Sequence, residues 1–217
     1  MHGINLQAIR SWFRHLFIIV PVVGLFISAA AEASLIITVG NVFANSPSSN
    51  NTLEVNLINT GPASISLAGF SFEIQVADAH ITFTSASIAT LAPYVFAGNS
   101  LFGPTTSTSA PGQILDVSDV WGGLGGATVA PGATVGLGHV FFNVSAGDLS
   151  GRVTVMLSPF PATSLSDPAG ANVSVGSLTN GSITTPTAAV PEPSALALAF
   201  LGFAALVSIR RPFRRTN

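Results

Sequence analysis

The sequence ISLAGFSFEIQV, residues 65–76, decides the fold class of this chain. Its apolar residues alternate with polar ones from Phe70 to Val76. In an extended strand, successive side chains point to opposite faces, so this alternation places one face in a core and the other toward solvent. The Asn-Thr-Gly-Pro sequence at 59–62 precedes the run and predicts a turn. The stretch is therefore predicted to be a half-buried β-strand.

Similar short runs recur along the chain, separated by clusters of Gly, Pro, Ser and Asn. They are residues 35–39, 52–58, 81–86, 114–120, 135–144, 153–157 and 173–178. Strands and turns at this spacing are typical of sandwiches and barrels. We therefore predict an all-β domain over residues 34–183, built as a jelly-roll-like antiparallel β-sandwich. Two segments depart from the pattern: 87–94 is expected to form one short helix, and 97–112 an exposed loop.

The first 33 residues are expected to be a secretory signal peptide. An uncharged apolar run, 16–30, follows two arginines, and Ala31 and Ala33 supply the small residues that signal peptidase requires. Export through the Sec translocon and cleavage before Ser34 are therefore predicted. The alternative is an uncleaved membrane anchor, which a run this short argues against.

The other end of the chain, residues 191–217, has a different order of elements. Pro191-Glu192-Pro193 is followed by an uncharged apolar stretch and then by four arginines within six residues, and 184–190 precedes it as a linker. A helix over 194–209 is roughly 24 Å long, slightly under a ~30 Å hydrocarbon core. The arginines should stay cytoplasmic, leaving the body on the periplasmic side. A buried helix of the globular domain is the alternative, and it fits poorly with polarity gathered at one end.

This order of elements resembles the PEP-CTERM sorting signal of Gram-negative bacteria. The resemblance implies that an exosortase, a membrane peptidase, cleaves near the motif, and that a helix over 195–209 holds the exported protein at the inner membrane before processing. It assigns Pro191, Glu192 and Pro193 to recognition and Arg210, Arg211, Arg214 and Arg215 to the cytoplasmic stop. It further implies a cell-surface or extracellular-matrix location in bacteria that make exopolysaccharide. It assigns no biochemical activity.

The body shows a second resemblance, carried by two strands. The segment 67–74, LAGFSFEI, is followed after a polar stretch and the Ala130-Pro131-Gly132 turn by 138–144, GHVFFNV. This order resembles the cohesin-type, carbohydrate-binding-module-like sandwich, in which the two strands form facing core layers. The resemblance implies a fold used for contact with a protein or a glycan. It transfers no contact residue.

Composition excludes several classes of function. The chain has no Cys, so thiolate metal sites, disulfides and cysteine nucleophiles are impossible. Between residues 34 and 190 one base stands against seven acids, a net charge of −6. A nucleic-acid partner is not expected, because the basic footprint that binds phosphate is missing there.

Candidate catalytic and metal-binding residues are few. His80 and His139 are isolated and are expected to be solvent-facing strand residues, and no nucleophile elbow is found. Asp116 and Asp119 lie three apart and should face opposite sides of a strand, which argues against a glycosidase pair. A calcium site drawing on these two with Asp148 or Asp167 is conceivable from the oxygen ligands alone, but no calcium-binding repeat supports it. We predict no enzyme activity, no catalytic residue, no metal and no cofactor.

Trp121 is the residue singled out as a candidate ligand contact. It lies at a strand end before the flexible Gly122–Gly126 loop, and sugars usually bind on an exposed aromatic ring. The alternative is a core Trp that anchors the loop. The chain is thus expected to be an exported, non-enzymatic envelope or matrix protein with a structural or adhesive role. The alternative is a module that binds exopolysaccharide or a surface protein.

Overall fold

A computed structural model of the chain describes residues 34–147, 151–186 and Phe203. The predicted signal peptide with Ala31 and Ala33 lies outside these residues, and so does Asp148. The Pro191-Glu192-Pro193 motif and the four C-terminal arginines lie outside them too. In the part of the chain that is described, no helix is long and apolar enough to cross a membrane.

The described body is built almost entirely from strands, as the alternation predicts. The strands are β1 Leu35–Val39, β2 Asn41–Phe43, β3 Ser48–Asn59, β4 Ile65–Leu67, β5 Gly69–Gln75, β6 Ile81–Ser87, β7 Thr105–Ser109, β8 Ile114–Val120, β9 Ala127–Val129, β10 Thr134–Val144, β11 Gly151–Leu157, β12 Ser164–Ser166, β13 Asn172–Val173, β14 Ser177–Thr179 and β15 Gly181–Thr185. A 3₁₀ turn, η2, covers Ala110–Gly112. The predicted all-β class is confirmed for this body.

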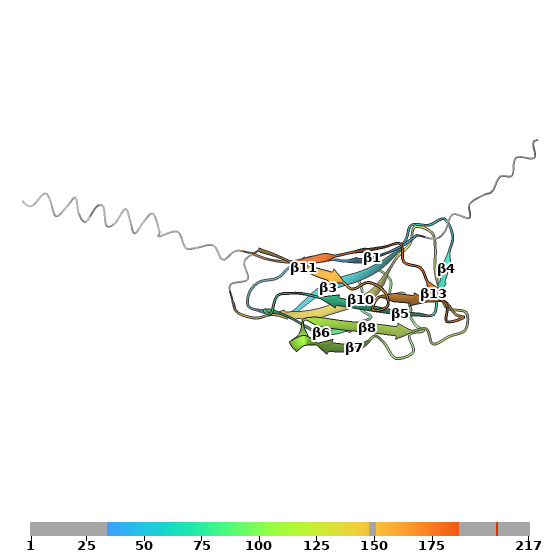
Figure 1. Cartoon of the computed structure of the whole chain (residues 1–217), viewed down its shortest axis with the longest axis horizontal. Helices are drawn as coiled ribbons and strands as arrows, with labels where there is room; N and C mark the ends of the chain where they lie inside the picture. The colour runs from blue at the N-terminus through green and yellow to red at the C-terminus, as the bar shows by residue number, and fades with distance from the viewer. Residues whose placement is uncertain (1–33, 148–150, 187–202, 204–217) are drawn as a thin grey trace, which may run out of the picture. The chain divides into compact units, whose positions relative to one another are not determined.

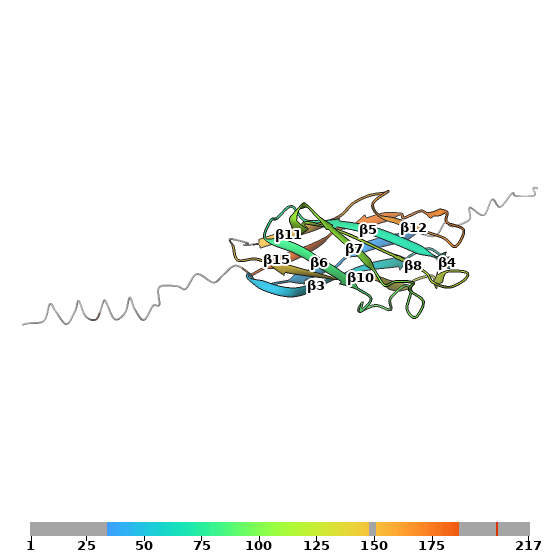
Figure 2. The same ribbon diagram turned by 90° about the horizontal axis from the view of Figure 1, so that it is seen from below.

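The strands form two main sheets that pack face to face (Figures 1 and 2). One sheet has the order β14-β1-β3-β10-β6. The other has the order β13-β12-β5-β11-β15-β2, with β8 on the free side of β5 and β7 beyond it. A separate small pair, β4-β9, continues at one end.

Among the described residues, all strand pairs are antiparallel except two, which join the first two strands of the body to its last two. β14 runs parallel to β1, and β15 runs parallel to β2. The chain passes from one sheet to the other between β1 and β2 and again between β14 and β15. The β14–β15 segment therefore runs parallel to the β1–β2 segment in both sheets. Because Leu35 pairs with Asn59 while Thr184 pairs with Phe43, Ser34 and Thr185 lie at opposite ends of the sandwich.

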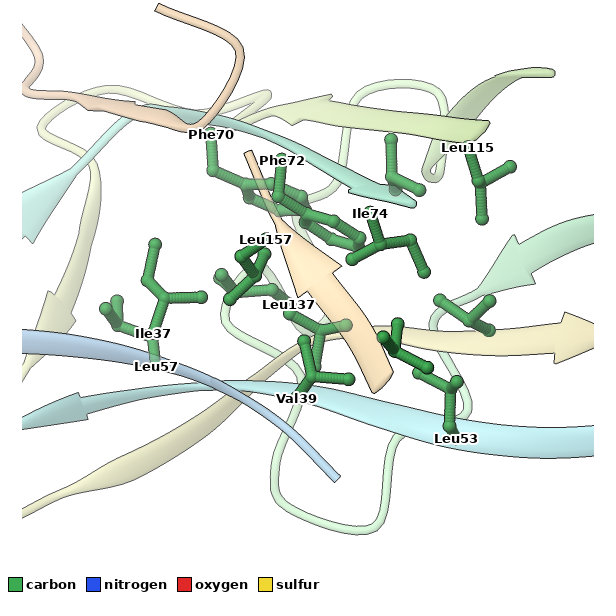
Figure 3. Close-up of a cluster of buried hydrophobic side chains, with 14 of the residues drawn as sticks. Ile37, Val39, Leu53, Leu57, Phe70, Phe72, Ile74, Leu115, Leu137 and Leu157 are labelled. Atoms are coloured by element: carbon green, nitrogen blue, oxygen red, sulfur yellow. The ribbon is translucent and has the colours of Figure 1, made fainter. Parts of the chain in front are cut away.

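The core lies between the two sheets (Figure 3). Phe72 and Ile74 of β5 point into the space between the sheets, which Ile37 of β1 and Leu57 of β3 enter from the other side, and all four side chains are fully buried. β5 and β10 face each other across the core, as predicted. Gly138 of β10 packs so closely on Phe72 of β5 that a Cβ at position 138 would lie 3.1 Å from the Phe72 ring. Burial of these side chains is the main favourable contribution to folding.

Strand β10 departs from simple alternation. Leu137 and Val140 are both buried although they lie three residues apart, and the register with β3 shifts between Gly136 and Gly138. A β-bulge inserts one extra residue and so returns the following side chains to the core face. This shift depends on how β10 pairs with β3, and so it cannot be predicted from the alternation within β10 alone.

Several segments differ from the predictions. The predicted strand 65–76 is broken at Ala68 into β4 and β5, and the predicted strand 173–178 is divided into β13 and β14, which lie in different sheets. Residues 88–94 form an irregular loop, not a helix, because Tyr94 pairs with Gly136 and the Val95 amide donates to the Gly136 carbonyl. The predicted exposed loop 97–112 contains β7, an edge strand whose hydroxyl side chains carry no alternation signal. The predicted linker 184–190 begins inside the sheet, since β15 ends at Thr185.

Candidate functional site

The outer face of β5, β7 and β8 carries two rows of polar side chains. Strand register places Thr105 beside Ser118 and Ser118 beside Ser71. The second row runs from Ser107 through Asp116 to Glu73. We call these six residues the hydroxyl face. On β5 and β8 the intervening residues are buried. The outer residues of β8 are exposed, whereas Ser71 and Glu73 of β5 are half-buried and form hydrogen bonds with residues 158–164.

Glu73 and Asp116 form a carboxyl pair at the centre of the hydroxyl face. They are direct cross-strand partners, and the Ser158 hydroxyl donates to Glu73 Oε1. Burial raises the pKa of Asp116 above its ordinary value, and the negative charge of Glu73 and a hydrogen bond with its carboxyl raise it further. A like charge on the neighbouring strand disfavours the ionised form of Asp116.

The carboxyl pair lies beside a shallow depression of about 180 Å³, lined by Ser71, Thr105, Ser107, Ser118 and other residues. In glycosidases the two carboxyl groups flank the sugar bond at roughly 5 Å or more. Here Glu73 and Asp116 are adjacent cross-strand partners on one sheet face, not groups placed opposite each other across a cleft. The arrangement suits recognition through hydrogen bonds.

Asp119, on the opposite side of β8 as predicted, is buried and has a structural role. Tyr94 Oη and Ser100 Oγ each donate to Asp119 Oδ2 at 2.6 Å. The Val120 amide donates to Asp119 Oδ1 at 2.7 Å. Burial, followed by the hydrogen bond and charge of Asp119, raises the pKa of Tyr94, so the phenol stays protonated as a donor. This cluster ties the loop after β6 to β8.

Trp121 lies at the end of β8 and is half-buried. Its ring meets Phe96 edge-on at 5.9 Å between centroids. A Cβ on Gly123 would lie 2.8 Å from the Trp121 indole nitrogen, so the glycine backbone passes directly over the ring. That nitrogen is buried and has no hydrogen-bond partner among the described residues. The geometry matches a loop anchor, and a ligand contact at Trp121 stays a prediction.

The two body histidines do not meet. His139 is a strand residue of β10, as predicted, but its side chain is only 18% exposed, because Nδ1 pairs with Glu54 Oε1 and the ring packs on Phe141. His80 lies in the turn before β6 instead of in a strand, and its ring nitrogen is 3.0 Å from Asp78 Oδ1. Each histidine therefore has a single carboxylate partner of its own.

The calcium candidates are also separated. Asp116 faces solvent beside Glu73, Asp119 is buried beneath the same strand, and the Asp167 carboxylate accepts the amides of Ala169 and Ala171 in its own turn. The residues that the structure describes contain no group of three His, Asp or Glu side chains placed to hold a metal ion.

Alternation alone indicates that Glu73 and Asp116 point outward, but not that they meet. Their pairing depends on β5 lying beside β8, although β6 and β7 come between these two strands along the chain. No local pattern in the sequence reports that neighbour relation, because it is made by strand pairing between distant segments.

Comparison with known proteins identifies the C-terminal segment. The family model described as the PEP-CTERM protein-sorting motif matches residues 189–215, so the chain carries this motif. No curated protein matches the chain significantly.

The body is similar to solved cohesin structures. The complex of CaDoc0917 with CaCohA2, the latter from Clostridium acetobutylicum, matches at 15% identity and a TM-score of 0.54, over 70% of this chain and 99% of that one. A type I cohesin–dockerin complex from Clostridium thermocellum matches at 13% and 0.52, over 70% and 99%. A non-cellulosomal cohesin from Archaeoglobus fulgidus matches at 16% and 0.50, over 76% and 98%. The likeness shows that the body is a cohesin-like β-sandwich.

Proposed function

We propose that this chain is an exported surface protein whose cohesin-like body binds a partner protein through the hydroxyl face. The observation that carries the proposal is the hydroxyl face, whose β7 and β8 side chains are exposed, on a cohesin-like sandwich that is joined to a sorting motif at 189–215. The similar structure from Clostridium thermocellum is named as a complex of a cohesin with a dockerin. A dockerin-like partner is the corresponding proposal for this chain.

The chemistry of the hydroxyl face suits a protein partner. Thr105, Ser107 and Ser118 are exposed, and short hydroxyl side chains both donate and accept hydrogen bonds. They lose little side-chain entropy when a partner orders them. The Glu73–Asp116 pair adds the charge of the face and favours a partner with donors or a cationic group opposite it.

Export and processing form the other half of the proposal. The chain is exported through the Sec translocon, and signal peptidase, which requires the small residues Ala31 and Ala33, removes residues 1–33 by cleaving before Ser34. A helix over 195–209 anchors the body at the inner membrane, with the Arg-rich end as its cytoplasmic stop, and an exosortase-type peptidase cuts near Pro191-Glu192-Pro193. The processed protein then reaches the cell surface or extracellular matrix of a Gram-negative bacterium, an exopolysaccharide setting in which it has no catalytic role.

Processing is tested by the intact mass of the protein from envelope and medium of the native host. A species that runs from Ser34 to the region of Pro191 supports both cleavages. Glu192→Ala should leave the Arg-rich tail attached, whereas Glu32→Ala should still be processed at the C-terminal motif. A wild-type species that retains the tail would show a permanent anchor instead.

Partner binding is tested with the tagged full chain expressed in its host. Chemical crosslinking should capture a defined surface protein, and Ser118→Arg should abolish the crosslink by placing a long cationic side chain in the middle of the face. Phe43→Arg, at an 84% exposed position of β2 that β11 and β15 separate from β5, should leave it intact. An equal loss in both variants, or no loss in either, argues against this face.

A further inference from the structure

A second concave site lies at the open edge between the two sheets. The chain leaves β13 at the edge of one sheet and enters β14 at the edge of the other, so residues 174–176 cross between them. Beside this crossing is a pocket of about 350 Å³. That volume is at the lower end of the range for small-molecule sites. The hydroxyl face does not take part in it.

The lining of this edge pocket is polar and carries no charge. It includes the Asn172 amide and the hydroxyls of Thr163, Ser164, Ser174 and Ser177. No Asp, Glu, Lys, Arg or His is among its lining residues. A phosphate or carboxylate ligand would lack a cationic partner here, and a metal ion would lack a carboxylate. The ligand that matches such a lining is neutral and rich in hydroxyl groups.

The polar side chains divide into two groups. Thr163 and Ser164 are engaged, because the Glu73 amide donates to Thr163 Oγ1 at 3.4 Å and Ser164 Oγ lies 2.9 Å from Ser71 Oγ. Asn172, Ser174 and Ser177 are exposed, and their side chains form no hydrogen bond with another described residue. Together they offer an amide and two hydroxyls, which can donate to and accept from a ligand.

One wall of the pocket is an exposed aromatic ring. Phe160 is 67% exposed, although Phe is among the residues most often buried. The turn that carries it is held in place, since the Ala162 amide donates to the Pro159 carbonyl at 3.1 Å and the Ser158 amide to the Glu73 carbonyl at 2.9 Å. The ring therefore lies on an ordered turn, beside polar side chains that form no hydrogen bond with another described residue.

We infer that the edge pocket binds a neutral saccharide. One apolar C–H face of a sugar ring would pack on Phe160, while its hydroxyls would bind Asn172, Ser174 and Ser177. Aromatic packing plus a few uncharged hydrogen-bonding groups is the combination that a polyol without charge requires. This inference extends the proposed export to the surface and is independent of protein binding through the hydroxyl face.

The test is native affinity electrophoresis of the full chain in a polyoxyethylene detergent, which carries no sugar that could compete. The gels contain dextran, hydroxyethylcellulose or galactomannan, with alginate as the anionic comparison. Retardation is expected in at least one neutral gel. Phe160→Ala and Asn172→Ala should each weaken it about tenfold, a loss equivalent to about 1.4 kcal/mol.

Phe102→Ala is the matched control, because Phe102 is 83% exposed and does not line the pocket. It should bind like the wild type, and equal thermal midpoints should show that all variants fold. The inference is overturned if no neutral gel retards the chain, if only alginate does, or if Phe160→Ala binds like Phe102→Ala. None of these results bears on processing or on crosslinking through the hydroxyl face.

Discussion

The two sides of the β5–β8 strand pair have opposite roles. The inner side carries Phe72 and Leu115, which are fully buried. The outer side carries Asp116 and Ser118, which are exposed, and Glu73, which is half-buried and is the cross-strand partner of Asp116. A substitution on the inner side should therefore act on stability, and one on the outer side should act on recognition.

The largest effect is expected from Phe72→Ala. Removing a fully buried ring loses its transfer free energy and leaves a cavity between the sheets, at a cost of about 3–5 kcal/mol in unfolding free energy. Urea unfolding of the purified protein measures this. Phe102→Ala, on an exposed ring, should stay within about 0.5 kcal/mol of the wild type. Similar losses in both variants would contradict the division of the two sides.

A smaller loss is expected from Asp119→Ala, the inward-facing carboxylate of β8. The substitution leaves Tyr94 Oη and Ser100 Oγ without their acceptor, and a buried unpaired donor costs about 1–3 kcal/mol. Unfolding free energies of the single variants and of Tyr94→Phe with Asp119→Ala form a double-mutant cycle. The two losses should be less than additive. Full additivity would mean that the two groups do not interact.

The carboxyl pair should make stability depend on pH. Because the pKa of Asp116 is raised in the folded state, the folded protein binds this proton more tightly than the unfolded chain does. This contribution is present below the ordinary Asp pKa and is lost as pH rises through the raised value. Asp116→Asn should remove that part of the pH dependence and stabilise the neutral-pH protein by about 0.2–1 kcal/mol, the range for cross-strand pairs.

Thermal midpoints measured from acid to neutral pH, for the wild type and Asp116→Asn, test this expectation. Asp167→Asn is the control, since Asp167 lies away from Glu73 in a turn of its own. The expectation fails if Asp116→Asn and the wild type show the same pH dependence, or if the variant is less stable at neutral pH.

The smallest effect on stability is expected from Ser118→Ala on the hydroxyl face. Its side chain is exposed, so the unfolding free energy should change by less than about 0.5 kcal/mol. Its neighbour Val117, 1% exposed, is the matched inward position, and Val117→Ala should cost clearly more. Equal costs for the two neighbours would show that the outer face contributes packing.

Much of the fold could be predicted because a strand with one buried face has an apolar residue at every second position. The alternation from Phe70 to Val76 correctly separated the inner and outer sides of β5, and the runs at 35–39 and 114–120 match β1 and β8. β7 was predicted as part of an exposed loop because Thr105–Ser109 is an edge strand with neither face in the core. The loop after β6 was wrongly predicted as a helix because its conformation depends on the pairing of Tyr94 with Gly136.

By itself, the sequence determined that the body is all-β and which side chains of β5 face inward, and it carries the sorting motif at 189–215. The tertiary structure decided which outward residues meet. Glu73 reaches Asp116 through strand pairing, and Phe160 reaches Ser174 and Ser177 at the edge between the sheets. The physical reason is that burial repeats every second residue along a strand, whereas neighbours across sheets are set by pairing between distant segments.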